Sequence, residues 1–554
     1  MKSTLLFIAG WAVLTRAVTV TVTTFANHAV TTTTTTYSFE KLVTTCPCEC
    51  EGAACTDTST KPTSYSANPS DLAYPSFSNV TGPLADSAPA GLPNATTLAA
   101  EALALIFELK ASSTKNCKAC KDAFAAVAAR MKVEQETLSN IANPLCSQLA
   151  SIIPTPVCIG LLKIGSTDIG GIFPAMDMQG EEGQILCAFM FGTCDLPAPP
   201  PLDLNTLFKG TKKPNPRALA PCTKEPLKVL HISDYHLDLR YVVGSEANCD
   251  GPSPTCCRVY PYTNMSAPIQ EPASFFGNYM CDTPEALGTS VFRAVPDVTG
   301  HKWCDFSFGI FTGDLVSHDL WELTPEYVLA EELTSYQNFF DGMGGVPMYP
   351  TLGNHDTFPH AFAAFPNLDD VLPTNASYSV QEEYNYQNIS AAWENYGWLN
   401  ASEAQQVVTS GLGIYRAVTP EGLVIISLNS DVDMTGMFAT LIDYLLEAEA
   451  KDQAVWLIQH VNTGGSTGYE ALPAATDLYY QIIDRFNNTI RATFFGHTHL
   501  DEFGVFYANN ATVQTADTAA SVAYIGQSVT THTNLNAGFR YISWTLTPLT
   551  YSTL

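Results

Sequence analysis

The sequence predicts an α/β domain of the α+β sandwich type over residues 227–554 and, before it, a small all-α disulfide-rich domain over residues 113–198. Short β-prone runs alternate with amphipathic stretches in the longer part, which is typical of α/β sheets. In the shorter part, cysteines frame segments of helical spacing. Prolines concentrate at residues 199–226, where we expect an extended linker.

The N-terminal residues have the order of a secretory signal peptide, which we place at residues 1–17. Lys2 provides the positive charge, residues 5–14 are apolar, and small residues near Ala17 allow cleavage. Residues 18–112 are rich in Thr, Ser and Pro, so we expect a flexible or O-glycosylated leader without a fold. No later run is apolar over the roughly 18 residues that a membrane span needs. We therefore expect a soluble mature protein that is secreted or held in an acidic organelle.

Composition restricts the partners and the compartment. The formal net charge of −28 argues against nucleic acid, because phosphate backbones are bound by basic surfaces. The chain has 16 cysteines without paired zinc-site spacing, which indicates disulfides and an oxidising compartment. We expect a monomer. Glycosylation is predicted at eight Asn-x-Ser/Thr sequons: Asn79, Asn94, Asn264, Asn375, Asn388, Asn400, Asn487 and Asn510.

The cysteines outside the small domain fall into two groups. Four lie in the leader, at Cys46, Cys48, Cys50 and Cys55, where a local disulfide knot is favoured over metal chelation. The others flank or follow the first predicted strand of the large domain. Their expected pairs are Cys249–Cys256, Cys257–Cys281 and, because each partner precedes one of two neighbouring parallel strands, Cys222–Cys304.

Strands and helices of the large domain follow from hydrophobic periodicity. Segments after residue 500 are β-like and are expected to form a second sheet that covers the first. In open α/β sheets, ligands gather at the carboxyl ends of the strands. The predicted strands are 227–233, 305–312, 346–352, 423–428, 454–459, 491–495, 502–507, 521–525 and 540–547, and the predicted helices are 285–295, 322–340, 437–450 and 477–486.

Five strand ends carry potential metal ligands. Each is weak alone, since a single histidine is more often structural and Gly-His-Thr-His can be a turn. Together they predict one dinuclear metal site, because Asp, His and Asn suit divalent ions such as zinc, and such a site supports phosphoester hydrolysis. The clusters are Asp234-x-His236, Gly313-Asp314-x-x-x-His318, Gly353-Asn354-His355-Asp356, His460 and Gly496-His497-Thr498-His499. His231, His301 and His360 lie outside this pattern, and we expect them to be structural or solvent-exposed.

In this order, the motifs resemble the calcineurin-like metallophosphoesterase family. The resemblance implies that His355 contacts the phosphate and helps the leaving oxygen depart, with His318 as a second candidate acid. Two divalent ions are expected, and the imidazole-rich set favours zinc. By the resemblance, Asp234, His236 and His499 hold one ion, Asn354, His460 and His497 hold the other, and Asp314 bridges them.

The six cysteines between residues 117 and 194 permit fifteen pairings. Their pattern resembles the saposin B-type domain, which implies a lipid substrate or a membrane surface. A disulfide-stapled helical bundle with a structural role is the alternative. The pairs that the resemblance implies are Cys117–Cys194, Cys120–Cys187 and Cys146–Cys158.

A saposin-like module joined by a proline-rich linker to this catalytic domain is similar to the acid sphingomyelinase family. Supporting strings are Cys256-Cys257-Arg258 and His318-Asp319-Leu320-Trp321. The resemblance implies hydrolysis of sphingomyelin, at a phospholipid membrane surface, to ceramide and phosphocholine. The chain departs from the family after His460, where Val461-Asn462-Thr463 replaces a proline-rich continuation. Two alternatives remain: a phosphodiesterase acting on nucleotides or other small phosphoesters, and a non-catalytic lipid-binding protein.

Overall fold

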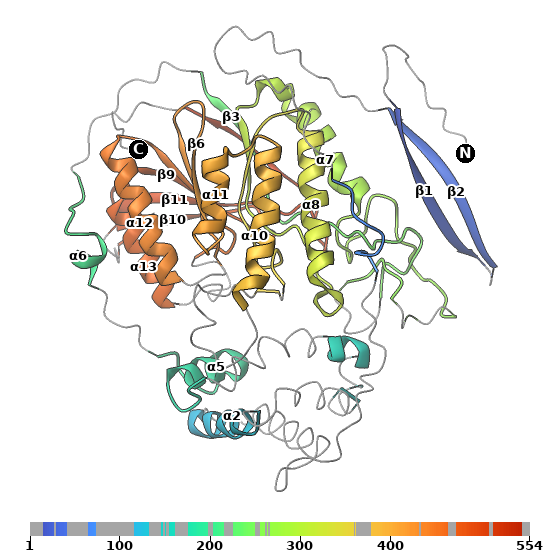
Figure 1. Ribbon diagram of the computed structural model, residues 1–554, viewed down its shortest axis with the longest axis horizontal. Helices are drawn as coiled ribbons and strands as arrows, with labels where there is room; N and C mark the ends of the chain where they lie inside the picture. Colours follow the sequence, from blue (N-terminus) through green and yellow to red (C-terminus); the bar gives the residue numbers. More distant parts are fainter. Residues whose placement is uncertain are drawn as a thin grey trace.

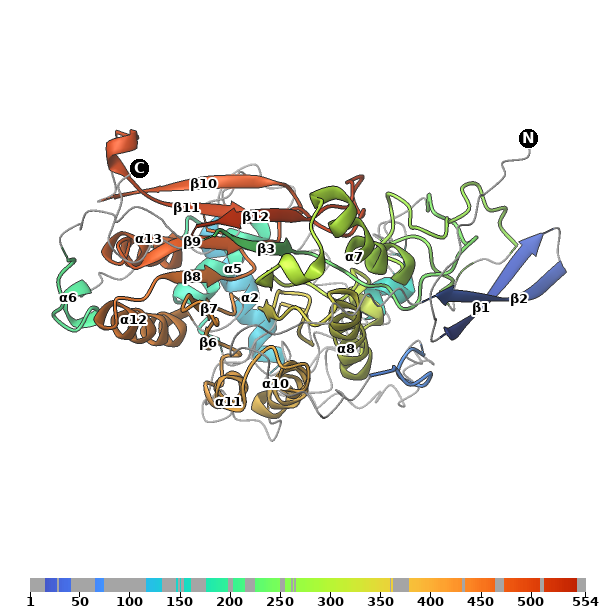
Figure 2. The ribbon, with the colours of Figure 1, turned by 90° about the horizontal axis from the view of Figure 1, so that it is seen from above.

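Two β-sheets packed face to face form the centre of the protein in the computed structural model, with helices on their outer faces (Figures 1 and 2). The disulfide-rich helices α2 and α5 lie apart from these layers (Figure 1). The structure describes residues 15–26, 29–40, 65–73, 116–131, 146–147, 150, 154–160, 176–197, 203–214, 225–249, 255–260, 263, 266–358, 360–361, 378–430, 434–463, 473–508 and 513–545.

The first sheet has four strands in the order β12-β3-β4-β5. Strands β3, β4 and β5 are parallel, and β12 pairs antiparallel with β3. Helices α7 and α8 pack on this side of the molecule (Figure 2). The bounds are β3 (Leu227–Ile232), β4 (Phe308–Phe311), β5 (Met348–Pro350), β12 (Arg540–Trp544), α7 (Glu285–Thr299) and α8 (Pro325–Gly342).

The second sheet has six strands in the order β10-β11-β9-β8-β7-β6, of which β11, β9, β8 and β7 are parallel. Helices α12 and α13 cover its outer face through apolar residues at helical spacing, such as Leu441, Leu445, Ile482 and Ile483. The strand bounds are β6 (Tyr415–Val418), β7 (Val424–Ser427), β8 (Val455–Ile458), β9 (Ile490–Phe495), β10 (Glu502–Tyr507) and β11 (Ala519–Ile525). The helix bounds are α10 (Tyr378–Asn395), α11 (Ala401–Thr409), α12 (Met434–Ala450) and α13 (Pro473–Arg485).

The core between the sheets contains aromatic side chains from both. Phe308 of β4 contacts Trp456 of β8 edge-on, with ring centroids 5.7 Å apart, and Trp456 also contacts Phe494 of β9. All three side chains are buried. Strands buried on both faces read as continuous apolar runs, which is why the sequence revealed them.

The predicted fold class is confirmed, and the predicted strands and helices of the large domain are present with shifted ends. One expectation was wrong: the three C-terminal segments do not form a separate sheet. Strand β12 joins the first sheet beside β3, whereas β10 and β11 extend the second sheet from β9. Apolar alternation shows that a segment is a strand, but not which sheet edge it completes. Strand β6 and helices α10 and α11 were not predicted.

The leader also contains structure where none was expected. Strands β1 (Thr15–Ala26) and β2 (Ala29–Glu40) form an antiparallel hairpin, consistent with their Thr and Val content. Residues 65–73 lie against the large domain, where Arg240 donates hydrogen bonds to the carbonyls of Leu72 and Ala73. The four leader cysteines lie outside the described residues.

The small domain contains helices α2 (Cys117–Met131) and α5 (Glu181–Phe191), and a helical turn at residues 155–160. The structure pairs its cysteines as the resemblance implied, with Cys117–Cys194 and Cys120–Cys187 joining α2 to the α5 region. The third pair is Cys146–Cys158. Val157 packs with Tyr260 and Trp321, so this part of the small domain contacts the large one.

The expected linker is only partly extended. It contains the short helix α6 (Leu204–Leu207), and Phe208 is buried against Phe486 at the end of α13. Asn488 donates a hydrogen bond to the Pro214 carbonyl at 2.9 Å. Residues 203–214 of the expected linker therefore pack on the second sheet's helices. The predicted domain boundaries stay predictions.

The remaining predicted modifications are placed as follows. Cys249–Cys256 and Cys257–Cys281 are formed, whereas Cys222 lies outside the described residues, so its pairing with Cys304 stays a prediction. Among the sequons, Asn388 and Asn400 are exposed and Asn487 is half-buried; the other five lie outside the described residues. Within the described part of the chain, no helix has both the length and the apolar character to cross a membrane.

Candidate metal centre

The predicted ligand clusters meet at one edge of the two sheets. Strands β3, β4 and β5 of the first sheet and β8 and β9 of the second each end just before one cluster. The two sheets are joined there by a hydrogen bond of 2.7 Å between His460 Nδ1 and the Thr312 carbonyl. Side chains that are distant in the sequence are thereby brought within contact distance.

The backbone of the site is strained. Five of the seven predicted ligands have φ values in the left-handed region, which residues with a Cβ rarely adopt. Such strain persists only where the surrounding structure enforces it, and it concentrates at functional sites. The five are Asp234 (φ 50°), His236 (40°), Asp314 (67°), His497 (75°) and His499 (62°).

Two glycines allow the clusters to approach closely. A Cβ on Gly353 would lie 2.2 Å from Asp314 Oδ1, and a Cβ on Gly496 would lie 2.1 Å from Ser233 Oγ. Both distances are far shorter than van der Waals contact. The glycines in the Gly-Asn-His and Gly-His-x-His motifs are therefore required by the distance between neighbouring strand ends.

Asp314 lies between the two predicted ligand sets. Its Oδ2 atom is 3.4 Å from His236 Nε2 and 3.1 Å from His460 Nε2. Its Oδ1 atom accepts a hydrogen bond of 2.8 Å from the His355 amide. This position between an imidazole of each set is the one that a bridging carboxylate needs.

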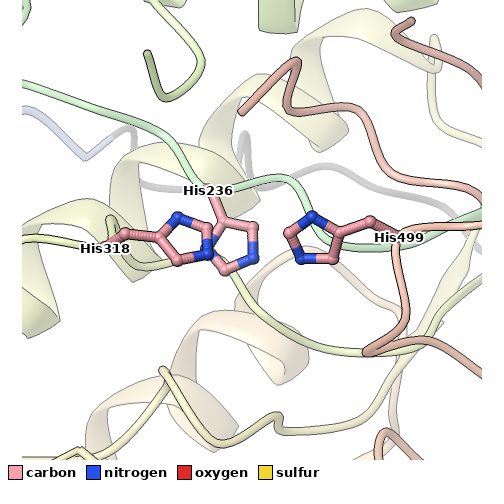
Figure 3. A group of neighbouring side chains, drawn as sticks. All are labelled: His236, His318 and His499. Carbon is pink, nitrogen blue, oxygen red and sulfur yellow. The ribbon is translucent and has the colours of Figure 1, made fainter. Parts of the chain in front are cut away.

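The other ligands group around these atoms. Asp234 Oδ1 lies 3.4 Å from His499 Nε2 and accepts a hydrogen bond from the His497 amide. The potential ligand atoms of Asp314, His460 and His497 all lie within 4.8 Å of one another. His236, His318 and His499 form a second such group, and their rings lie in a row (Figure 3).

The donor atoms fit divalent cations. His236 Nδ1 lies 2.6 Å from the Val316 carbonyl, and His460 Nδ1 also faces a carbonyl. Because carbonyls only accept hydrogen bonds, both Nδ1 atoms carry the ring hydrogen. The Nε2 lone pair of each ring therefore points toward the Asp314 carboxylate. Two facing acceptors need a proton or a cation between them. Buried His236 Nε2 and Asn354 Oδ1 also have no hydrogen-bond partner among the described residues. A cation would satisfy both atoms.

The charges of the site agree with this reading. Burial lowers the pKa of His236 to about 3 and that of His497 to about 4, which keeps both imidazoles in the neutral, coordinating form. Burial also disfavours a charged His460, but the Asp314 and Asp234 carboxylates outweigh it and raise the pKa of His460. The two carboxylates thus favour positive charge next to His460 Nε2, which either a proton or a divalent cation can supply.

The two candidate acids have different surroundings. His318 Nδ1 lies 2.7 Å from Asp282 Oδ1; burial opposes protonation, but this carboxylate raises the pKa of His318. His355 is buried, and burial lowers its pKa well below the ordinary value. Its ring lies 4.6 Å from that of His318. His318 is therefore the better proton donor of the pair.

The sequence of the larger domain agrees with this geometry. Residues 227–501 match the calcineurin-like phosphoesterase family. The larger domain therefore has the metallophosphoesterase fold. The family implies divalent metal ions, in agreement with the ligand clusters.

Three curated relatives are similar to this chain over more than half of its length. Sphingomyelin phosphodiesterase B of Dictyostelium discoideum is 29% identical over 446 residues, 76% of this chain and 64% of that protein. Sphingomyelin phosphodiesterase of Homo sapiens is 29% identical over 450 residues, 76% of this chain and 65% of that protein. A cyclic GMP-AMP phosphodiesterase of Mus musculus is 27% identical over 322 residues, 53% of this chain and 63% of that protein. The chain thus spans slightly less than two thirds of the length of these relatives.

Three residues of the candidate site were missed by the sequence analysis or given no role in it. Asp282 holds His318, and His532 stacks on it with ring centroids 4.5 Å apart. Asp356 accepts hydrogen bonds from the amides of Asp314, Leu315 and Gly353, which ties two strand ends together. Asp282 and His532 lie in loops without a recognisable motif, so no local signal marked them.

His360, which was expected to be structural or solvent-exposed, is partly buried beside the candidate site. Its Nε2 atom lies 2.9 Å from Asn354 Nδ2, and its ring contacts that of His355. The loop after β5 turns back on itself to place it there. His231 and His301 are structural as expected: His231 is bonded to Thr312, and His301 to Tyr541.

Proposed function

We propose that this protein is a metal-dependent phosphodiesterase that hydrolyses sphingomyelin to ceramide and phosphocholine. The observation that carries the proposal is Asp314, placed between imidazoles of two ligand sets on strained strand ends. The sphingomyelin phosphodiesterases among the relatives support the substrate.

Two divalent ions, zinc by the chemistry of the ligands, would occupy the centre. Asp234, His236 and His499 would hold one ion, Asn354, His460 and His497 the other, and Asp314 would be shared. When bound, the ions would supply Lewis acidity toward a phosphoryl oxygen and make water a stronger nucleophile at neutral pH.

The protein's own residues would complete the reaction. His318, protonated through its contact with Asp282, donates its proton to the departing ceramide oxygen, so that the leaving group departs as an alcohol. If the leaving oxygen faced His355 instead of His318, His355 would be the proton donor. Because His355 is neutral, it is better suited to a hydrogen bond with the phosphate. Asp282 keeps the His318 ring oriented with its Nε2 atom available.

The small domain would serve the same reaction at a membrane. The pattern of its three disulfides resembles saposin B-type domains, which act on lipids, and it contacts the large domain near Trp321. A sphingomyelin-containing bilayer is the partner that this arrangement suits. The disulfides and sequons further support secretion or residence in the lumen of an acidic organelle.

Nucleotide hydrolysis is the second candidate, favoured by the relative that acts as a cyclic GMP-AMP phosphodiesterase. We would compare phosphocholine release from sphingomyelin vesicles at acidic pH with hydrolysis of a soluble cyclic dinucleotide by the same preparation. Phosphocholine release that a chelator abolishes and zinc restores supports the proposal. Hydrolysis of the nucleotide alone would overturn the substrate, and no hydrolysis of either would overturn the activity.

A further inference from the structure

An exposed aromatic loop lies next to the candidate active site. We call residues 266–281 the aromatic loop. Three of its large apolar side chains are exposed to solvent: Ile269 (37%), Phe276 (56%) and Tyr279 (50%). Phe275 contacts Phe276 edge-on. Single exposed apolar residues are ordinary, but three on one short loop indicate an interaction surface.

The loop is held rigidly in this exposed position. The Cys257–Cys281 disulfide closes its end, and Ala273 exchanges backbone hydrogen bonds with Gly244 and Ser245. Tyr241 Oη donates a hydrogen bond of 2.7 Å to the Ser274 carbonyl. Because the backbone is fixed, these side chains remain exposed without the rearrangement that could bury them.

The aromatic loop is connected directly to the catalytic histidine. Asp282, which holds His318, immediately follows it in sequence. His532, which stacks on His318, is flanked by two hydrogen bonds to the loop. Thr531 Oγ1 donates to the Asn278 carbonyl, and the Asn534 amide donates to the Tyr279 carbonyl, each at 2.9 Å. A surface that contacts this loop therefore lies beside the reaction centre.

The charge around the loop restricts what it contacts. No Lys or Arg occurs between Arg258 and Arg293. Glu246 accepts hydrogen bonds from the Gln270 and Glu271 amides, which places carboxylates at the base of the loop. An anionic lipid surface would be repelled by these carboxylates, and the loop itself has no basic residue to attract it. An uncharged or zwitterionic surface would not be repelled.

The side chains suit the interface of a bilayer. Tyr279 has an exposed ring whose hydroxyl lies 3.3 Å from Asn536 Oδ1, so the residue combines an apolar body with a hydrated end. Aromatic residues of this kind collect at the level of lipid headgroups. Three side chains also cover much less than the roughly 1,000 Å² that a stable protein interface buries. A second protein is therefore a poorer fit than a membrane.

We propose that the aromatic loop is a membrane-docking surface of the phosphoesterase domain, which inserts Phe276 and Tyr279 among zwitterionic headgroups and so sets the active site against the bilayer. This inference rests on the proposed function, since it concerns how a lipid substrate reaches the site. It assigns the large domain a membrane contact of its own, in addition to any contact made by the small domain.

The first experiment compares the full-length wild type with Phe276→Ser/Tyr279→Ser. Val298→Ser is the control, because Val298 is more exposed (73%) than either loop residue but lies outside the loop. We expect the double variant to lose about tenfold or more in sphingomyelin-vesicle hydrolysis and in sedimentation with phosphatidylcholine vesicles. Hydrolysis of a monomeric short-chain sphingomyelin should stay within about twofold of the wild type. The control should match the wild type throughout.

Several outcomes would overturn the inference. Equal losses on vesicles and on the monomeric substrate would show that the loop acts through the site and not through a membrane. Unchanged vesicle binding would remove the docking role, and self-association lost only in the double variant would assign the surface to a second copy. If no preparation hydrolyses sphingomyelin, the proposed function fails, while loop-dependent vesicle sedimentation still decides the docking proposal.

A second measurement reads insertion directly and does not depend on activity. Phe276→Trp preserves an aromatic side chain, and Val298→Trp places the same reporter outside the loop. Difference fluorescence against the wild type should show a blue shift with zwitterionic vesicles for Phe276→Trp alone. A shift of equal size in both variants, or in neither, would contradict insertion of the loop.

Discussion

His318 is bonded twice to Asp282: the imidazole Nδ1 lies 2.7 Å from Asp282 Oδ1, and the His318 amide donates to Oδ2 at 2.7 Å. Asp282 is buried, so its carboxylate acts on the ring without competition from solvent. One carboxylate thus fixes both the backbone and the ring of the better candidate acid.

Asp282→Asn should therefore reduce turnover more than substrate binding. Removing the Asp282 charge lowers the pKa of His318, so His318 loses its proton at a lower pH. The alkaline limb of the pH–activity profile should therefore move to lower pH. We expect kcat to fall about 10- to 100-fold, since general acids contribute about 10²- to 10⁴-fold. The pH profile with monomeric substrate provides the measurement. A uniform loss without movement of the limb would contradict the role of Asp282.

Asp314→Asn should lower metal content as well as activity. The amide has no charge to balance two cations, so the purified variant should retain fewer ions than the wild type by elemental analysis. Loss of bound ligand should also lower the midpoint of thermal unfolding. Asp443→Asn, at an exposed position on α12, is the matched control. Wild-type metal content in the Asp314 variant would rule out the shared carboxylate.

Gly353→Ala should disable the centre although it adds one methyl group. Its Cβ would lie 2.2 Å from Asp314 Oδ1 and 2.6 Å from the Asp314 amide nitrogen, so one strand end must move. A displacement of about 1 Å can cost about 100-fold in rate, and we expect a loss of that size in kcat. Gly504→Ala is the control, because its nearest neighbour would be 3.8 Å away. Equal activity of the two variants would contradict the steric account.

Arg258→Ala should destabilise the fold beneath the site. Arg258 is buried and forms ion pairs with Asp238 and Asp319, both buried, and Asp319 follows His318 in sequence. Removing one partner of a buried pair leaves uncompensated charge and costs about 3–5 kcal/mol of unfolding free energy. Chemical denaturation measures this loss. Exposed Arg293→Ala should change stability by less than about 0.5 kcal/mol, and similar values for both would refute the prediction.

The strand-end clusters of candidate ligands could be predicted because their signals are local. A buried parallel strand reads as a short apolar run, and the residues after it, such as Asp234 or His497, reach the same sheet edge in any α/β arrangement. The need for Gly353 and Gly496 became clear only from the structure, which shows how closely the strand ends approach. The order of the motifs supplied the metallophosphoesterase resemblance, which implied the roles of the candidate ligands. A separate resemblance, to saposin B-type domains, implied the nested disulfides that spacing alone left open.

Tertiary structure alone decided the contacts between distant segments. Asp282, His532 and His360 lie in loops whose conformations depend on disulfides and on hydrogen bonds to other loops, so no periodicity revealed them. The assignment of β10, β11 and β12 to two sheets depends on which edges they complete, not on their own sequence. Side-chain type and spacing determine the chemistry that a chain offers. Packing between distant segments determines which of those side chains meet.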